Sequence, residues 1–304
     1  MNPYLLIFSA AMLWALVGIF TALLLAAGMG ALEIAFWRAA IAASAFTIHS
    51  LVTGQYLLRR RSDLAVFIAF GLVGVTLFFS SLSLAVDTGG ISLAVVLLYT
   101  APVFVIILAR VFLGESLTAA KASAVALVVG GVALIAFGGD STGISITAVS
   151  LGWGLCAGLS YALLSVGGKY LLTNYNPVTI YAYIMPVGAL GLAPIVELSL
   201  PSTTAFLWLL PLGILSTYAS SLLYYTGLHR AQASRAVLVA STEPVIAAVL
   251  AAIFFGERFG FLGALGAAMV VLASLIGVFW RSGKIPTDRS AGANRSAGAS
   301  NGGA

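Results

Sequence analysis

The stretch LLYTAPVFVIILARVFLGE, residues 97–115, decides the fold. It is an apolar run that carries one proline, Pro102, and ends in a Gly-Glu pair. A related stretch, VASTEPVIAAVLAAIFFGE, occupies residues 239–257, so a shift of 142 residues (239 minus 97) aligns Pro102 with Pro244 without a gap. The same pattern occurs twice in one chain, which predicts two homologous halves.

The composition is that of a membrane protein. Of the 304 residues, 61% are hydrophobic and 8% are charged, and the mean hydropathy is +1.11, whereas soluble domains carry about 25% charged residues. Apolar runs of about 20 residues, which suffice for a helix to cross a hydrocarbon core of roughly 30 Å, follow one another from Tyr4 to Trp280. The net charge of +5 lies in short connections and a tail, with no basic helix face, which argues against a nucleic-acid partner.

We therefore predict an all-α membrane protein with ten transmembrane helices. The run lengths and the Gly- and Ala-rich composition suit helices that satisfy their own backbone polar groups, whereas an outer-membrane barrel would show alternating segments of about ten residues. The helices are expected near residues 4–27, 32–53, 64–84, 89–113, 118–138, 147–172, 177–197, 204–228, 233–255 and 259–280.

The repeat divides the chain. Residues 1–138 are expected to form a first five-helix repeat, residues 139–281 a second, and residues 282–304 a disordered tail poor in apolar residues. Because five is an odd number, the second repeat should enter the membrane upside down, which gives a pseudo-two-fold axis in the membrane plane. The prediction is two inverted five-helix repeats.

The positive charges predict the orientation. With a cytoplasmic N-terminus, twelve of the fourteen Lys and Arg residues lie on the inside, as the positive-inside rule requires. These are Arg59, Arg60, Arg61, Arg110, Lys121, Lys169, Arg230, Arg235, Arg281, Lys284, Arg289 and Arg295. Asp87, Asp140 and Glu197 then fall in external connections, and both termini are cytoplasmic.

Two prolines indicate where a transport path could pass. Proline inside a helix removes one N–H group and clashes with the carbonyl four residues earlier, so Pro102 and Pro244 should kink their helices. Matching breaks in two halves are typical of a transporter site, because freed carbonyls are tolerated only where protein surrounds them. Tyr99 and Ser241, three residues before each proline, occupy equivalent places.

Aromatic residues gather around the same path. The expected substrate-binding residues are Trp14, Phe78, Phe79, Tyr99, Tyr161, Tyr224, Ser241 and Glu243. Tyr and Trp combine a flat apolar face with one polar group, which suits an aromatic or amphipathic solute. The competing interpretation is that such residues anchor span ends at the membrane interface.

Two charged residues lie within predicted helices. Glu243 follows Ser234 by nine residues, roughly 13 Å along a helix, so it lies near the bilayer middle and could bind a substrate amine, carry a proton or join a structural network. Arg38 could bind a substrate carboxylate, snorkel to the interface or pair with Glu33. Glu115 and Glu257 are expected to cap the next helix or to satisfy turn amides.

The order of these motifs resembles the EamA-type branch of the drug/metabolite transporter superfamily over roughly residues 4–280. The resemblance rests on the mid-helix prolines, on Gly114-Glu115 and Gly256-Glu257 twelve residues after them, on Phe36-Trp37-Arg38 and on Glu243-Pro244-Val245. It implies a ten-helix carrier of the bacterial inner membrane that exports amino acids, related metabolites or drugs. The aromatic residues make the chain similar to aromatic amino-acid exporters of that branch.

The expected function is export of small amphipathic metabolites, above all amino acids with large apolar side chains, by alternating access. Transport can be facilitated or proton-linked, and the alternatives are drugs, nucleobases or sugars as substrates, a channel, or an intramembrane enzyme. Only two histidines, one cysteine and no HExxH or Walker motif occur, so no catalytic residue, metal site or cofactor is expected. The expected partners are a small-molecule substrate and the lipid bilayer, and the oligomeric state stays open, with a monomer compatible.

Overall fold

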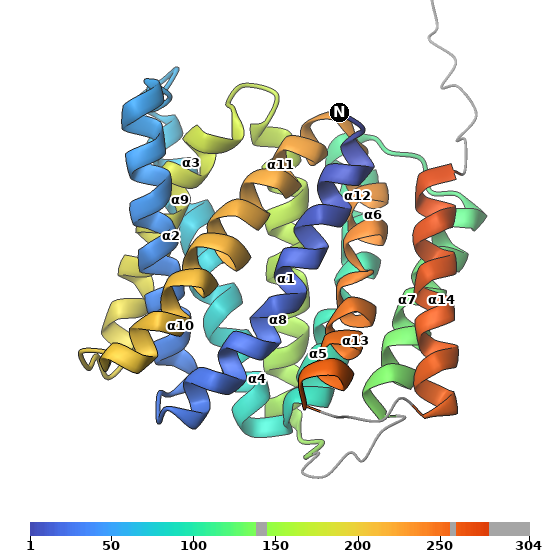
Figure 1. The fold of residues 1–304 in the computed structure, drawn as a ribbon. Helices are drawn as coiled ribbons and strands as arrows, with labels where there is room; N and C mark the ends of the chain where they lie inside the picture. Colours follow the sequence, from blue (N-terminus) through green and yellow to red (C-terminus); the bar gives the residue numbers. More distant parts are fainter. Residues whose placement is uncertain (138–144, 256–259, 280–304) are drawn as a thin grey trace, which may run out of the picture.

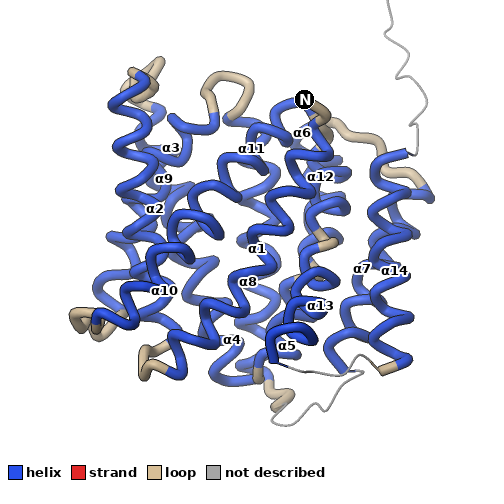
Figure 2. Tube along the Cα trace, in the orientation of Figure 1, coloured by secondary structure: helices blue, strands red, loops and turns tan. Residues whose placement is uncertain are grey.

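The computed structural model of the protein describes residues 1–137, 145–255 and 260–279, and every regular element in those ranges is a helix (Figure 2). The first five spans are α1 (Pro3–Ala26), α2 (Ala31–Thr53), α3 (Asp63–Gly71) continued by η1 (Leu72–Leu77) and α4 (Phe78–Gly89), α5 (Ile91–Leu98) continued by α6 (Ala101–Leu113), and α7 (Ala119–Phe137).

The remaining described helices form five more spans. They are α8 (Ala148–Leu171), α9 (Pro177–Leu192) with the short η2 (Ala193–Ile195), α10 (Thr203–Gly213) continued by η3 (Ile214–Ala219) and α11 (Ser220–Arg230), α12 (Ala233–Ala240) continued by α13 (Glu243–Phe255), and α14 (Phe261–Phe279). Ten helices in the described residues are thus long and apolar enough to cross a membrane, which confirms the predicted fold class.

The span ends agree with the prediction within two residues at every place but one. The third span was expected to end near residue 84, but α4 continues to Gly89, and the chain turns at Gly90 with a φ of 85°. Asp87, which we expected in an external connection, therefore lies in the last turn of α4. The Asp-Thr pair was mistaken for a loop, whereas Thr88 keeps its hydroxyl bonded to the Leu84 carbonyl at 2.6 Å and so fits within the helix.

The irregular features of the two halves lie at equivalent positions, 142 residues apart in the sequence. Adding 142 to the bounds of η1, α5, α6 and α7 gives the bounds of η3, α12, α13 and α14. Both η1 and η3 are π-helical segments, which the sequence did not reveal. In Figure 1, α6 lies above α5 while α12 lies above α13, so these corresponding pairs run in opposite directions.

The two spans that contain Pro102 and Pro244 are interrupted rather than merely bent. The amide of Thr100 bonds to the Leu97 carbonyl at 3.1 Å, and the amide of Thr242, which is 142 residues later, bonds to the Val239 carbonyl at 3.1 Å. Pro102 and Pro244 each stand second in the helix that follows, where a missing N–H group has no partner to lose. Each proline therefore starts a new helix, where the sequence analysis expected a kink within one.

Helix α8 approaches the first interruption closely. A Cβ added to Gly158 would lie 2.9 Å from the Thr100 hydroxyl oxygen and 3.3 Å from the Leu98 carbonyl oxygen. A Cβ added to Gly154 would meet the Leu97 side chain at 2.4 Å. These two glycines therefore pack the second half against the broken span of the first, which keeps the freed Leu98 carbonyl inside protein.

The predicted tail at 282–304 and the residues Asp140 and Glu257 lie outside the described residues. The remaining packing separates a central group of helices from a pair at the edge. Figure 1 shows α7 and α14 side by side there, and a Cβ on Gly131 would lie only 2.6 Å from the Gly266 carbonyl oxygen. Most of the residues considered below come from the central group.

Candidate functional site

Four aromatic side chains from four helices meet in the central group. Trp14 of α1 has its ring centroid 5.1 Å from that of Tyr224 in α11 and 6.4 Å from that of Tyr161 in α8. Tyr161 in turn lies 5.8 Å from Phe78 of α4. These separations fall within the range of tilted and edge-to-face ring contacts. Trp14, Phe78, Tyr161 and Tyr224 are called the aromatic cluster below.

Hydrogen bonds and a second group of rings hold the cluster. Tyr224 shares a hydrogen bond of 3.2 Å with Ser165, and the neighbouring Tyr225 donates to the Leu164 carbonyl at 2.8 Å. Tyr225 also contacts Tyr181, with ring centroids 4.6 Å apart. Sequence reasoning missed Ser165 and Tyr181, because nothing in an apolar run marks which of its residues support a site.

Arg38 lies next to this cluster and not at the outer interface with Glu33. Its Cζ atom is 4.7 Å from the centroid of the Phe79 ring, and its Nε atom donates to the Thr217 hydroxyl at 3.2 Å. Phe79 contacts Phe78, with centroids 5.4 Å apart, so Phe79 links the charge to the aromatic cluster. Glu33 accepts a hydrogen bond from Ser199 at 2.5 Å.

Glu243 is the first residue of α13 and directly follows the interruption in its span. Its carboxyl group interacts with the Tyr99 side chain and is attracted by the charge of Arg38, and it also lies within electrostatic range of Tyr161. The N-terminus of a helix stabilises a negative charge through its dipole and free amides. Arg38 and Glu243 thus place a basic and an acidic side chain beside the same set of rings.

Two other residues of the expected site, Tyr99 and Ser241, lie at the interruptions and have partners within the protein. Tyr99 ends α5 and packs against Leu238 and Val125, while only its polar end engages Glu243. Ser241 is 1% exposed and donates to the Val237 carbonyl of its own helix at 2.8 Å. Its hydroxyl is therefore already engaged within the interruption.

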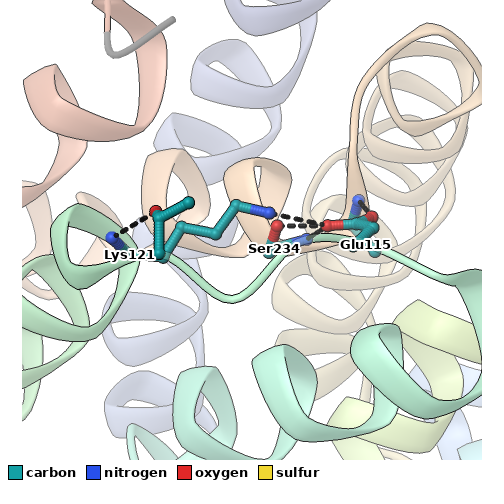
Figure 3. Close-up of polar contacts among 5 residues, drawn as sticks. Glu115, Lys121 and Ser234 are labelled. Carbon is teal, nitrogen blue, oxygen red and sulfur yellow. Dashed lines mark hydrogen bonds and ion pairs between the residues drawn. The ribbon is translucent and has the colours of Figure 1, made fainter. Parts of the chain in front are cut away.

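Glu115 makes a contact that the sequence did not foresee (Figure 3). Oε1 accepts from the Ala233 amide at 2.7 Å, and Oε2 accepts from the Ser234 amide at 3.3 Å and from the Ser234 hydroxyl. Lys121 forms an ion pair with Oε2 at 3.3 Å. Glu115 was expected to cap the helix after it, but it caps α12, which lies in the other half.

Glu115, Lys121, Ala233 and Ser234 are called the Glu115 clasp. On the other side of the short turn before α12, Lys169 donates to the carbonyls of Leu228 and His229, both at 2.9 Å, at the C-terminus of α11. Negative charge meets a helix N-terminus and positive charge meets a helix C-terminus, which matches both helix dipoles. The turn between α11 and α12 is thus held from two sides.

The same end of the molecule carries a second tie between the halves. Tyr175, between α8 and α9, donates to the Asp63 carboxylate and accepts from the Arg59 amide at 3.0 Å. Burial, together with the hydrogen bond to Asp63, raises the pKa of the Tyr175 hydroxyl. The connection between α2 and α3 is therefore fastened to the second half.

In the part of the chain that the structure describes, no group of three or more His, Cys, Asp or Glu residues could hold a metal ion. The fold and the central group of charged and aromatic residues define a multi-pass membrane protein with a polar interior.

The chain belongs to the EamA-like transporter family, whose model matches residues 1–137 and again residues 149–279. An uncharacterized transporter of Archaeoglobus fulgidus is 29% identical over 251 residues, which cover 81% of this chain and 87% of that one. A second uncharacterized transporter of that organism is 29% identical over 197 residues, 65% of this chain and 70% of its own length. A solved crystal structure matches with a TM-score of 0.77 over 91% of this chain and 96% of that one, at 17% identity, and shows the fold.

Proposed function

We propose that this transporter exports amino acids with large apolar side chains across the bacterial inner membrane. The observation that carries the proposal is the aromatic cluster with one basic side chain, Arg38, and one acidic side chain, Glu243, beside it. An amino acid has one positive and one negative group beside an apolar or aromatic side chain. The three parts of such a solute match the three kinds of side chain in this region.

The proposed mechanism is alternating access between two inverted repeats, residues 1–138 and 139–281, with both termini in the cytoplasm. The common register of the interruptions and the π segments supports it, because two copies with the same irregularities can exchange conformations. The second match of the family model supports the duplication as well. Glu243 is proposed to receive the substrate amine or a coupled proton.

The proposal is tested by uptake of labelled phenylalanine and leucine into proteoliposomes that contain the purified protein, with protein-free vesicles as the blank. A carrier predicts saturable uptake that internal unlabelled substrate accelerates, whereas a channel predicts uptake that internal substrate leaves unchanged. A preset pH gradient distinguishes proton-linked from facilitated transport. No uptake of either amino acid would reject the proposed substrate class and direct the assay to drugs, nucleobases and sugars.

A matched pair of variants tests the site. Trp14→Leu removes one ring of the aromatic cluster and should abolish any preference for phenylalanine over leucine. Trp208→Leu is the control, because Trp208 contacts Phe20 with centroids 6.4 Å apart and is 36% exposed. Equal effects of the two variants would argue against the cluster as the binding site.

A further inference from the structure

Arg38 contacts two elements, one from each half of the chain. It belongs to α2, its guanidinium lies over the ring of Phe79 in α4, and its Nε atom bonds to Thr217 in η3. A stacked ring and a hydrogen bond fix both the plane and one edge of the guanidinium. Arg38 is therefore held in one orientation.

The π-helical segment η3 gives Thr217 an unusual hydrogen bond. Its hydroxyl donates to the Leu212 carbonyl, five residues earlier, at 2.9 Å, whereas hydroxyls in ordinary helices bond three or four residues back. Because the single hydroxyl proton is used in this bond, the lone pairs of the oxygen face the Arg38 Nε–H group. Thr217 is 2% exposed, so its hydroxyl oxygen accepts a hydrogen bond from Arg38 and not from solvent.

The outer edge of Arg38 is left for a ligand. Among the described residues, its Nε atom takes part in a hydrogen bond, while Nη1 and Nη2 have no hydrogen-bond partner in the protein. These two nitrogens present parallel N–H groups with the spacing of two carboxylate oxygens. Phosphate has a similar geometry, but the nearby carboxyl group of Glu243 disfavours a dianion more than a singly charged carboxylate.

We propose that Arg38 is a carboxylate-binding subsite and that Thr217 is its positioning residue. The inference rests on the proposed function, since it assigns one end of the proposed substrate. The carboxylate would bind Nη1 and Nη2, and the apolar side chain would reach the aromatic cluster through Phe79 and Phe78. The subsite thus selects solutes with a carboxylate over amines of the same shape.

The test is isothermal titration calorimetry of the purified protein with three probes: phenylalanine, 3-phenylpropionate, which lacks the amine, and phenethylamine, which lacks the carboxylate. In Arg38→Gln, the two carboxylates should bind about 10- to 100-fold more weakly, the range for a lost charged hydrogen bond, while phenethylamine binds as before. Arg38→Lys should recover only part of the loss, because an ammonium lacks the planar fork.

Variants of η3 separate positioning from packing. Thr217→Val, which keeps the shape but removes the hydroxyl, should weaken carboxylate binding about tenfold, and Thr217→Ser should restore it. Ser216→Ala is the matched control, because the neighbouring Ser216 hydroxyl is buried and has no hydrogen-bond partner among the residues that the structure describes. A Thr217→Val protein that binds carboxylates like the parent would remove Thr217 from the subsite.

The outcomes for subsite and transport are distinct. Carboxylate binding that depends on Arg38, without saturable amino-acid flux, would keep the subsite and reject the proposed transport. Saturable flux with carboxylate binding unchanged in Arg38→Gln would keep the transport and overturn the subsite. Failure of both carboxylates to bind the parent protein would also overturn the subsite.

Discussion

Glu115 contacts the ninth span and Glu243 belongs to it, but the two carboxyl groups have different partners. Both oxygens of Glu115 accept hydrogen bonds from the N-terminus of α12, and Lys121 neutralises the charge. Glu243 begins α13, interacts with Tyr99 and is attracted by Arg38, whose Nη1 and Nη2 atoms have no hydrogen-bond partner among the described residues. The difference separates a carboxylate that joins the two halves from one that we propose to contact a solute.

The largest expected effect is the loss of the Glu115 clasp. Glu115→Ala leaves Lys121, which is 5% exposed, without its partner and uncaps α12, so the free energy of unfolding should fall by about 3–5 kcal/mol. Thermal unfolding in detergent measures this. Glu33→Ala, which removes a carboxylate bonded to the Ser199 hydroxyl, is the control. An equal fall in stability in both variants would contradict a stabilising role of the Glu115 clasp.

Glu243→Gln should impair transport and leave the stability nearly unchanged. The amide keeps the size of the side chain and loses the charge, so saturable amino-acid flux should fall about 10- to 100-fold while the thermal unfolding midpoint stays close to that of the parent. Flux in proteoliposomes and unfolding of the same preparation are compared. A Glu243→Gln protein that unfolds at a lower temperature than the parent but transports normally would contradict the difference proposed between Glu243 and Glu115.

Tyr99→Phe should have a smaller effect on flux. The ring still packs against Leu238, but the hydroxyl that engages Glu243 is gone, so we expect up to about a tenfold loss. The double variant Tyr99→Phe/Glu243→Gln sharpens the test. If the two residues act together, the double variant should be no worse than Glu243→Gln, whereas multiplied losses would show independent roles.

Ser241→Ala should have the smallest effect. Because the hydroxyl already bonds to the Val237 carbonyl within its own span, its removal should change stability by less than about 0.5 kcal/mol and flux by less than about twofold. Initial rates of labelled phenylalanine uptake are compared between Ser241→Ala and the parent protein. A tenfold loss would mean that Ser241 contacts the substrate, as the sequence pattern first led us to expect.

The spans and their interruptions were predictable because they depend on local properties. Run length alone locates a membrane helix, and Pro102 and Pro244 mark the interruptions to within a few residues. Trp14, Phe78, Tyr161 and Tyr224 were also among the substrate-binding residues expected from the sequence, because aromatic residues gather around the predicted path. Their function as a substrate site stays a prediction.

The contacts between distant segments were not predictable. Glu115 and Ala233 are 118 residues apart, and no sequence rule indicates that a carboxylate after one helix caps another in the opposite half. The π segments likewise have no residue signature, so the position of Thr217 beside Arg38 could not be foreseen. These features depend on how helices pack and not on what each helix prefers alone.

The interruptions at Tyr99–Thr100 and Ser241–Thr242 have a consequence for the medium that a solute would meet. Each one ends one helix and begins another inside a membrane span, so the protein interior holds two C-terminal and two N-terminal helix ends. Their peptide dipoles are fixed in place, unlike those of water, and need no reorientation around an arriving charge. For the zwitterionic substrate that we propose, the backbone itself would act as a preorganised solvent in a region where lipid offers none.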